Sequence, residues 1–117
     1  MRLSLLFILV PFTATTVSFG TAEAACPGDT QMEMNSCAAD DYSLADAELN
    51  ATWRKLPKST QLLAAQRAWI AYRDAECSFR KAQFEGGSIA PLIFSSCLSE
   101  LTKERTKILI GDKQMLQ

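Results

Sequence analysis

The chain has 117 residues, 48% of them hydrophobic, and a net charge of −1 at pH 7. That length suits one domain, and the balanced charge argues against a nucleic-acid binder. There is no histidine, which excludes Ser-His and Cys-His catalytic dyads and removes the commonest general base and metal ligand. We therefore expect a protein that is not an enzyme and that uses no cofactor and no metal.

The first 24 residues have the layout of a bacterial secretory signal peptide. An apolar run follows Arg2 and ends at Pro11, and Ala22-Glu23-Ala24 has the small-x-small pattern of a cleavage site. The run is shorter than the roughly 20 residues that a membrane-spanning helix needs. We therefore expect residues 1–24 to be removed, residues 25–117 to form a single helical domain, and no stable membrane span to remain after cleavage.

The predicted location is the periplasm or the cell exterior. Cys26 leaves a lipid anchor as an alternative, because it follows two alanines near the cleavage site. Glu23, however, stands where a lipoprotein signal normally has an apolar residue. The signal sequence therefore favours a free exported protein over an anchored one.

The four cysteines predict two disulfides, because an even number in an exported chain indicates a disulfide framework. The gaps between Cys26, Cys37, Cys77 and Cys97 are 11, 40 and 20 positions, and none is the tight pair that a zinc site favours. Two antiparallel helices joined at Gly86-Gly87 would bring Cys77 and Cys97 to nearly the same height, since each residue rises 1.5 Å. We predict Cys77–Cys97, and Cys26–Cys37 by elimination.

A first helix is expected to begin at Thr30, where Thr30-Gln31-Met32-Glu33 forms a capping box. Apolar residues then recur at steps of three and four as far as Leu56, and Pro57 ends the segment or begins the next one. Ser43 could instead cap a separate helix. Three helices are therefore expected, or four if Ser43 breaks the first.

The second helix is expected from about Ser59 to Phe84. Its apolar stripe includes residues at seven-residue intervals, namely Leu63, Ile70, Cys77 and Phe84. Gly86-Gly87 ends it by allowing a left-handed backbone.

A third helix should follow, capped by Ser88, with Pro91 in its first turn and with fraying after Gly111. No segment alternates with period two, so no sheet is expected. The predicted fold class is all-α, a small antiparallel bundle held by two disulfides.

Polar residues interrupt the apolar stripes of all three helices: Asp46, Asn50, Gln66, Arg73 and Arg105. A half-buried guanidinium must be paired. We expect Asp46 to accept from Arg73 or Arg105, with Asn50 and Gln66 completing a structural polar layer between the helices. A ligand-binding cluster is the alternative.

The N-terminal third of the expected domain is acidic, since no lysine or arginine lies between Cys26 and Trp53. A partner-facing acidic segment could include Asp29, Glu33, Asp40, Asp41 and Glu48. Such a segment could steer a basic protein partner, although neutralisation by the basic remainder of the chain explains it equally well. The adjacent carboxylates Asp40 and Asp41 would point apart on a helix, so they do not resemble a glycosidase pair.

Several motifs together resemble the LprI-like lysozyme-inhibitor N-terminal domain family. They are Glu33 with Cys37, Ala45-Asp46-x-Glu48-Leu49-Asn50, Gln66-Arg67-x-Trp69-Ile70-x-Tyr72-Arg73-Asp74-x-x-Cys77, Gly86-Gly87-Ser88, and Cys97 with Thr102 and Arg105. The resemblance implies a small, exported, helical bacterial protein that binds a protein partner, such as a basic lysozyme whose cleft it would occlude without chemistry. The alternative is an envelope interaction module, an immunity or accessory protein with an unknown periplasmic partner.

Overall fold

The computed structural model describes residues 26–115, which form three helices. They are α1 (Gln31–Arg54), α2 (Thr60–Ala82) and α3 (Ala90–Met115), and no strand occurs in this range. The predicted all-α class with three helices is confirmed. None of these helices combines the length and the apolar character that a membrane span requires. The predicted signal peptide, residues 1–24, lies outside the described residues.

The start of α1 is fixed by the capping box that the sequence predicts. The Thr30 hydroxyl accepts a hydrogen bond from the Glu33 amide at 3.2 Å, and the Glu33 carboxylate accepts from the Thr30 and Asp29 amides at 3.0 Å. These hydrogen bonds, that from the Thr30 amide first, hold the pKa of Glu33 below its ordinary value. α1 then runs unbroken through Ser43, whose hydroxyl donates to the carbonyl of Ala39. The four-helix alternative is therefore wrong.

The two connections between the helices follow the sequence with two differences. Ser59 caps α2 by accepting from the Leu62 amide at 3.0 Å. α2 ends at Ala82, two residues before the predicted Phe84, and Gly86 has a positive φ of 81° in the turn that follows. Ser88 is not the residue before α3, which begins at Ala90; its carbonyl instead accepts from the Asn35 side chain at 3.1 Å.

The end of α3 lies later than expected. Fraying was predicted after Gly111, but the helix continues to Met115. A single glycine lowers helix propensity by only about 1 kcal/mol, which is too little to stop a helix whose preceding turns are packed.

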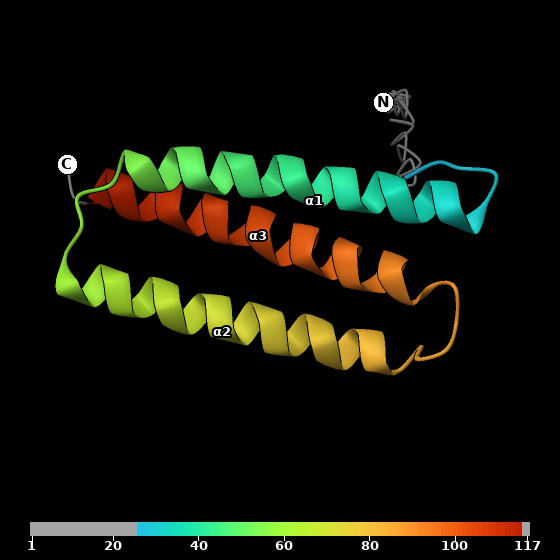
Figure 1. Cartoon of the computed structure of the whole chain (residues 1–117). Helices are drawn as coiled ribbons and strands as arrows, with labels where there is room; N and C mark the ends of the chain where they lie inside the picture. The colour runs from blue at the N-terminus through green and yellow to red at the C-terminus, as the bar shows by residue number, and fades with distance from the viewer. Residues whose placement is uncertain (1–25, 116–117) are drawn as a thin grey trace, which may run out of the picture.

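The three helices lie side by side, with α3 between α1 and α2 (Figure 1). Both outer helices pack on α3, whereas no Cα atom of α1 comes within 8 Å of one in α2. This arrangement explains why the apolar stripe expected inside the bundle is half-exposed. Leu63, Ile70 and Phe84 are 37%, 40% and 42% exposed, and of the four residues in that row only Cys77 is buried.

The core consists of two clusters along α3. One contains Cys77, Cys97, Leu98 and Leu101, with Tyr42 and Phe94 packed against it. The other contains Leu49, Leu56 and Leu109, with Trp53, Leu62 and Trp69 packed against it. Because α3 contributes to both clusters, it is the element on which the other two helices depend.

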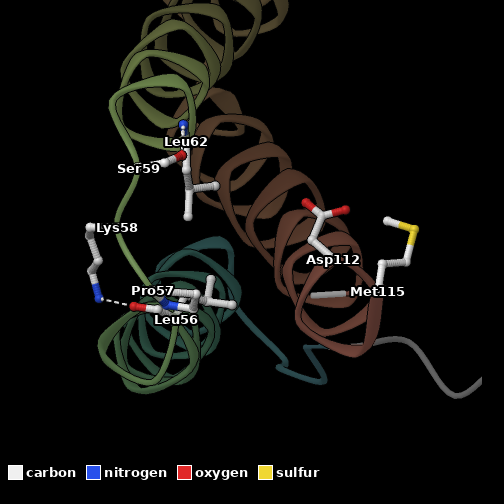
Figure 2. Close-up of a pocket in the computed structure, with 7 residues that line it drawn as sticks. All are labelled: Leu56, Pro57, Lys58, Ser59, Leu62, Asp112 and Met115. Carbon is white, nitrogen blue, oxygen red and sulfur yellow. Dashed lines mark hydrogen bonds between the residues drawn. The ribbon is translucent and has the colours of Figure 1, made fainter. Parts of the chain in front are cut away.

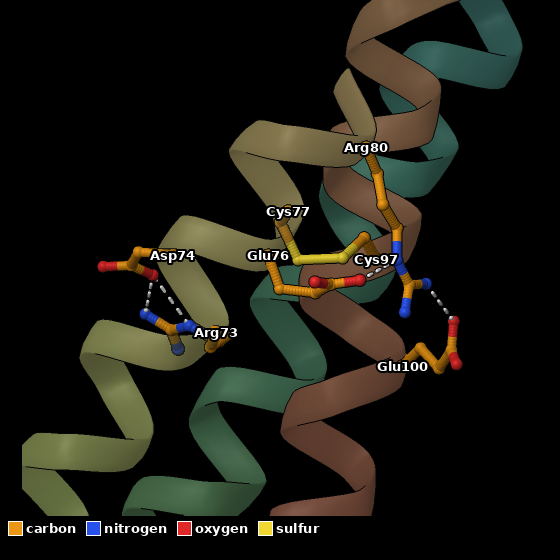
Figure 3. The surroundings of a disulfide bond; sticks show 7 residues. All are labelled: Arg73, Asp74, Glu76, Cys77, Arg80, Cys97 and Glu100. Carbon is orange, nitrogen blue, oxygen red and sulfur yellow. Dashed lines mark hydrogen bonds and ion pairs between the residues drawn. A yellow bond between two sulfur atoms is a disulfide. The ribbon is translucent and has the colours of Figure 1, made fainter. Parts of the chain in front are cut away.

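Both predicted disulfides are confirmed. Cys26 and Cys37 are joined with their Cα atoms 5.4 Å apart, and Cys77 and Cys97 with theirs 5.5 Å apart. The second bridge is buried and joins α2 to α3 near their connection (Figure 3). The first attaches the segment before α1 to that helix.

Candidate functional site

Asp41 is the acid of α1 that faces α3. Its carboxylate accepts a hydrogen bond from the buried Ser99 hydroxyl and pairs with the Lys103 ammonium at 2.9 Å. The hydrogen bond from Ser99, followed by that from Lys103, lowers the pKa of Asp41. Asp41, which the sequence places in the possible partner-facing segment, therefore joins α1 to α3 within the chain.

Glu33 is likewise used within the chain, because its carboxylate completes the capping box of α1. Three predicted partner-facing acids remain: Asp29, Asp40 and Glu48 are exposed and make no side-chain hydrogen bond or ion pair with other residues in 26–115. Asp46 is half-buried and accepts from Asn50 at 3.2 Å.

Asp40 and Glu48 stand on either side of an exposed leucine on α1. Residues four positions apart lie on one face of a helix, so Asp40, Leu44 and Glu48 form one row, which we name the α1 acidic face. Leu44 is 73% exposed. Sequence reasoning had found the two acids but missed the leucine, although its spacing of four from each acid was a readable signal. An apolar side chain between free carboxylates suits contact with a basic protein surface.

The five residues of the expected polar layer are distributed over separate contacts. Arg105 donates through Nε to the Gln66 side chain at 2.9 Å, while Arg73 pairs with Asp74 at 2.9 Å. The ion pair expected between Asp46 and an arginine is not among those of residues 26–115. The backbones of α1 and α2 do not come close to each other, and Arg73, which does reach α1, lies over the ring of Tyr42 and pairs with Asp74.

Arg73 and Arg105 both lie near the ring of Trp69. The guanidinium carbon of Arg73 is 5.1 Å from the Trp69 centroid and 5.8 Å from that of Tyr42, and the guanidinium carbon of Arg105 is 5.9 Å from Trp69. The side chain of Arg73 is only 11% exposed. Burial raises the pKa of Tyr42. These cation–aromatic contacts link α2 to both other helices, which is a structural role that the sequence did not specify.

A second charged group flanks the buried disulfide (Figure 3). Arg80 donates to Glu76 at 2.9 Å within α2 and to Glu100 of α3 at 3.2 Å. The hydrogen bond to Glu76 is the main reason why the pKa of Arg80 is raised. Since these side chains are partly exposed, the contact contributes at most about 1 kcal/mol.

An open pocket of about 480 Å³ lies where α1 passes into α2, beside the end of α3 (Figure 2). Its lining is largely apolar and consists of Leu56, Pro57, Lys58, Ser59, Leu62, Asp112 and Met115. The Lys58 ammonium donates to the carbonyls of Leu56, at 2.9 Å, and Trp53. It therefore binds the carbonyl of Trp53 in the last turn of α1 and that of Leu56 in the connection that follows. Within residues 26–115 no group of three or more acidic or cysteine side chains could hold a metal ion.

Comparison with known proteins points to one family. The family model described as "Lysozyme inhibitor LprI" matches residues 22–109. A Rhizobium meliloti (strain 1021) protein named "Uncharacterized protein R02472" is 41% identical over an alignment of 95 residues. The match covers 65% of this chain and 68% of that protein. No solved structure matches the chain. Because the family model spans most of the three-helix domain, the chain belongs to the lysozyme inhibitor LprI family.

Proposed function

We propose that this protein is an exported, non-catalytic inhibitor that binds a basic lysozyme and covers its substrate cleft. The observation that carries the proposal is the α1 acidic face, where Asp40 and Glu48 flank the 73% exposed Leu44. The membership of the chain in the lysozyme inhibitor family supports the choice of partner.

The distribution of charge on α1 favours a docking role over a purely internal one. The two acids that support the fold, Glu33 and Asp41, have partners within the chain, whereas Asp40 and Glu48 have none among the described residues. Unpaired surface carboxylates raise the rate of association with a positively charged protein. Leu44 supplies apolar area that only a partner would remove from water.

Inhibition would require no chemistry by this protein. The chain has no histidine, and the polar groups between the helices are used in contacts within the chain, such as Asp41 with Ser99 and Arg105 with Gln66. A bound inhibitor blocks the enzyme simply by occupying the cleft. The two disulfides suit the oxidising environment outside the cytoplasm, where such a target would be met.

The test is a lysis assay with the purified mature protein, its disulfides intact, and a basic animal-type lysozyme acting on bacterial cell walls. The wild-type protein should slow the loss of turbidity, and added salt should weaken the effect because charge steers the encounter. The double variant Asp40→Lys/Glu48→Lys should lose inhibition by roughly tenfold or more, since it turns attraction into repulsion.

The matched control is the double variant Glu85→Lys/Glu104→Lys. Both residues are exposed and form no ion pair with other described residues. This control changes the net charge by the same amount away from the α1 acidic face, and it should retain most of the inhibition. An equal loss of inhibition in both double variants would mean that net charge, and not the α1 acidic face, causes the effect. The proposal is overturned if the wild-type protein at high micromolar excess inhibits none of several lysozyme classes.

A further inference from the structure

We infer that the outward face of α2 is a dimerisation surface that pairs with α2 of a second copy, antiparallel and in one register. This surface is separate from the α1 acidic face, so the inference stands independently of the proposed function. It is defined by six residues, named here the α2 stripe: Ala65, Ala68, Tyr72, Ala75, Phe79 and Ala82.

The α2 stripe has the spacing of a helix that packs on another helix. Its members are separated by three, four, three, four and three positions, which is the heptad pattern of helix pairing. At 3.6 residues per turn, all six lie within about 60° of the direction opposite the buried Cys77. They therefore face away from α3, and every one of them is exposed.

The exposure of the two aromatic residues is the main sign that a partner is missing from this face. Tyr72 is 55% exposed and Phe79 is 63% exposed. The backbone of α2 packs only on that of α3, so α2 forms one edge of the helical layer (Figure 1). Adding a further helix at this edge would remove both aromatic side chains from water, which favours association.

The absence of charge from the α2 stripe argues against a charged partner. All the charged side chains of α2 lie outside the stripe, and most are engaged within the chain: Arg73 with Asp74, Arg80 with Glu76 and Glu100, and Lys81 near the ring of Phe94. A basic protein would therefore find no acid to pair with on this face, whereas a second copy meets an identical neutral face without repulsion.

The size of the face determines how strong the expected dimer should be. α2 has 23 residues, so at 1.5 Å per residue and a diameter of about 10 Å it offers a footprint of roughly 350 Å². A standard interface between two globular proteins removes about 800 Å² on each side. Because the face is smaller than that, pairing with α2 of a second copy predicts a weak, concentration-dependent dimer.

One antiparallel register makes the stripe complementary to itself. If Tyr72 lies opposite Ala75 of the second copy, then Phe79 lies opposite Ala68 and Ala65 opposite Ala82. Each aromatic ring then faces an alanine, so large side chains fill the space above small ones as in a well-packed core. The twofold axis of the dimer passes between residues 73 and 74, and both α1 acidic faces remain free on the far sides of the pair.

The experiment measures the mass of the purified mature protein by sedimentation equilibrium from low micromolar to millimolar concentration. The wild-type protein should pass from monomer to dimer across this range. The Ala75→Glu variant should dimerise at least roughly tenfold more weakly, because a carboxylate would be buried against a ring. The Ala39→Glu variant, with the same change at an exposed alanine of α1, should behave as the wild type, and circular dichroism should show equal helix content in all three.

A mixing experiment tests the register. The Tyr72→Lys variant alone should likewise dimerise more weakly than the wild type. Mixed with the Ala75→Glu variant, it should form a one-to-one dimer more readily than either variant alone, since the new lysine and glutamate would lie opposite each other. A wild-type protein that stays monomeric at millimolar concentration overturns the inference. So does an Ala75→Glu variant that dimerises as well as the wild type, or a mixture of the two variants that remains monomeric.

Discussion

The carboxylate of Asp41 on α1 accepts a hydrogen bond from the buried hydroxyl of Ser99 on α3, 58 residues further along the chain. Lys103, one turn later on α3, reaches the same carboxylate. A single acidic residue therefore joins the first and the last helix of the domain, and its immediate neighbour Asp40 points to solvent. Because the two residues have the same side chain and adjacent positions, they form a natural pair for comparison.

We expect Asp41→Ala to lower the free energy of unfolding by about 1–3 kcal/mol, because it leaves the buried Ser99 hydroxyl without its acceptor. The control, Asp40→Ala, removes an exposed carboxylate without a partner and should change stability by no more than about 0.5 kcal/mol. Urea unfolding followed by circular dichroism measures both. Equal losses in the two variants would mean that the contact with Ser99 contributes nothing.

Stability should fall on acidification, and Asp41 should contribute to that fall. Its pKa is lowered in the folded protein, chiefly by the hydrogen bond from Ser99. The folded state therefore binds the proton less readily than the unfolded state, whose Asp pKa is about 3.9. This contribution is complete above the unfolded value and is lost as the pH falls through the folded value. The free energy of unfolding of Asp41→Asn, measured from pH 6 to pH 2, should depend on pH less steeply than that of the wild type.

Thr102→Val should stabilise the protein by about 1 kcal/mol. The hydroxyl of Thr102 is buried and has no hydrogen-bond partner in the described part of the chain, so a side chain of similar shape removes an unsatisfied polar group. The matched change, Thr106→Val, deletes a hydroxyl that donates to the carbonyl of Thr102 at 3.0 Å and should not stabilise. Thermal unfolding measures the melting temperature of both variants. A melting temperature of Thr102→Val below that of the wild type contradicts the expectation.

Removing the buried disulfide by Cys77→Ala/Cys97→Ala should cost roughly 3 kcal/mol or more. The bridge closes a chain segment of 20 residues, and both sulfurs lie in the core, so the loss of packing adds to the loss of the cross-link. The pair Cys26→Ala/Cys37→Ala opens a loop of only 11 residues at the edge of the domain and should cost less. Denaturant unfolding without reductant measures the free energy of unfolding of both double variants. A larger loss for Cys26→Ala/Cys37→Ala would contradict the view that the Cys77–Cys97 bridge contributes more because it lies in the core.

The helices and their cross-links could be predicted from sequence because the signals are local. The capping box at Thr30 and the hydroxyl of Ser59 each fix the start of a helix through neighbours a few residues away, and Gly86 marks the turn after α2 with its positive φ. The disulfide between Cys77 and Cys97 followed from the position of one turn. Signals of this kind do not depend on how the helices are arranged.

The arrangement of the helices could not be predicted because hydrophobic periodicity identifies a face but not what covers it. Leu63 and Ile70 continue the row of Cys77, yet they are half-exposed because α1 packs on α3 and not on α2. Periodicity likewise could not show that Asp41 would meet α3, or that Arg73 would pair with Asp74 and not with Asp46. Of the predicted partner-facing acids, Glu33 and Asp41 therefore have partners within the chain, whereas Asp40 and Glu48 are exposed.

The central position of α3 has a consequence for how the domain folds. The two helices made first are neighbours in the sequence but have no backbone contact, and both bury their apolar sides on the helix made last. A chain that stops before Ala90 would hold α1 and α2 with nothing to cover them, so it should remain open to proteases. The domain can therefore fold only after the C-terminal quarter of the chain has been made. A chain that lacks α3 should stay unfolded and be degraded.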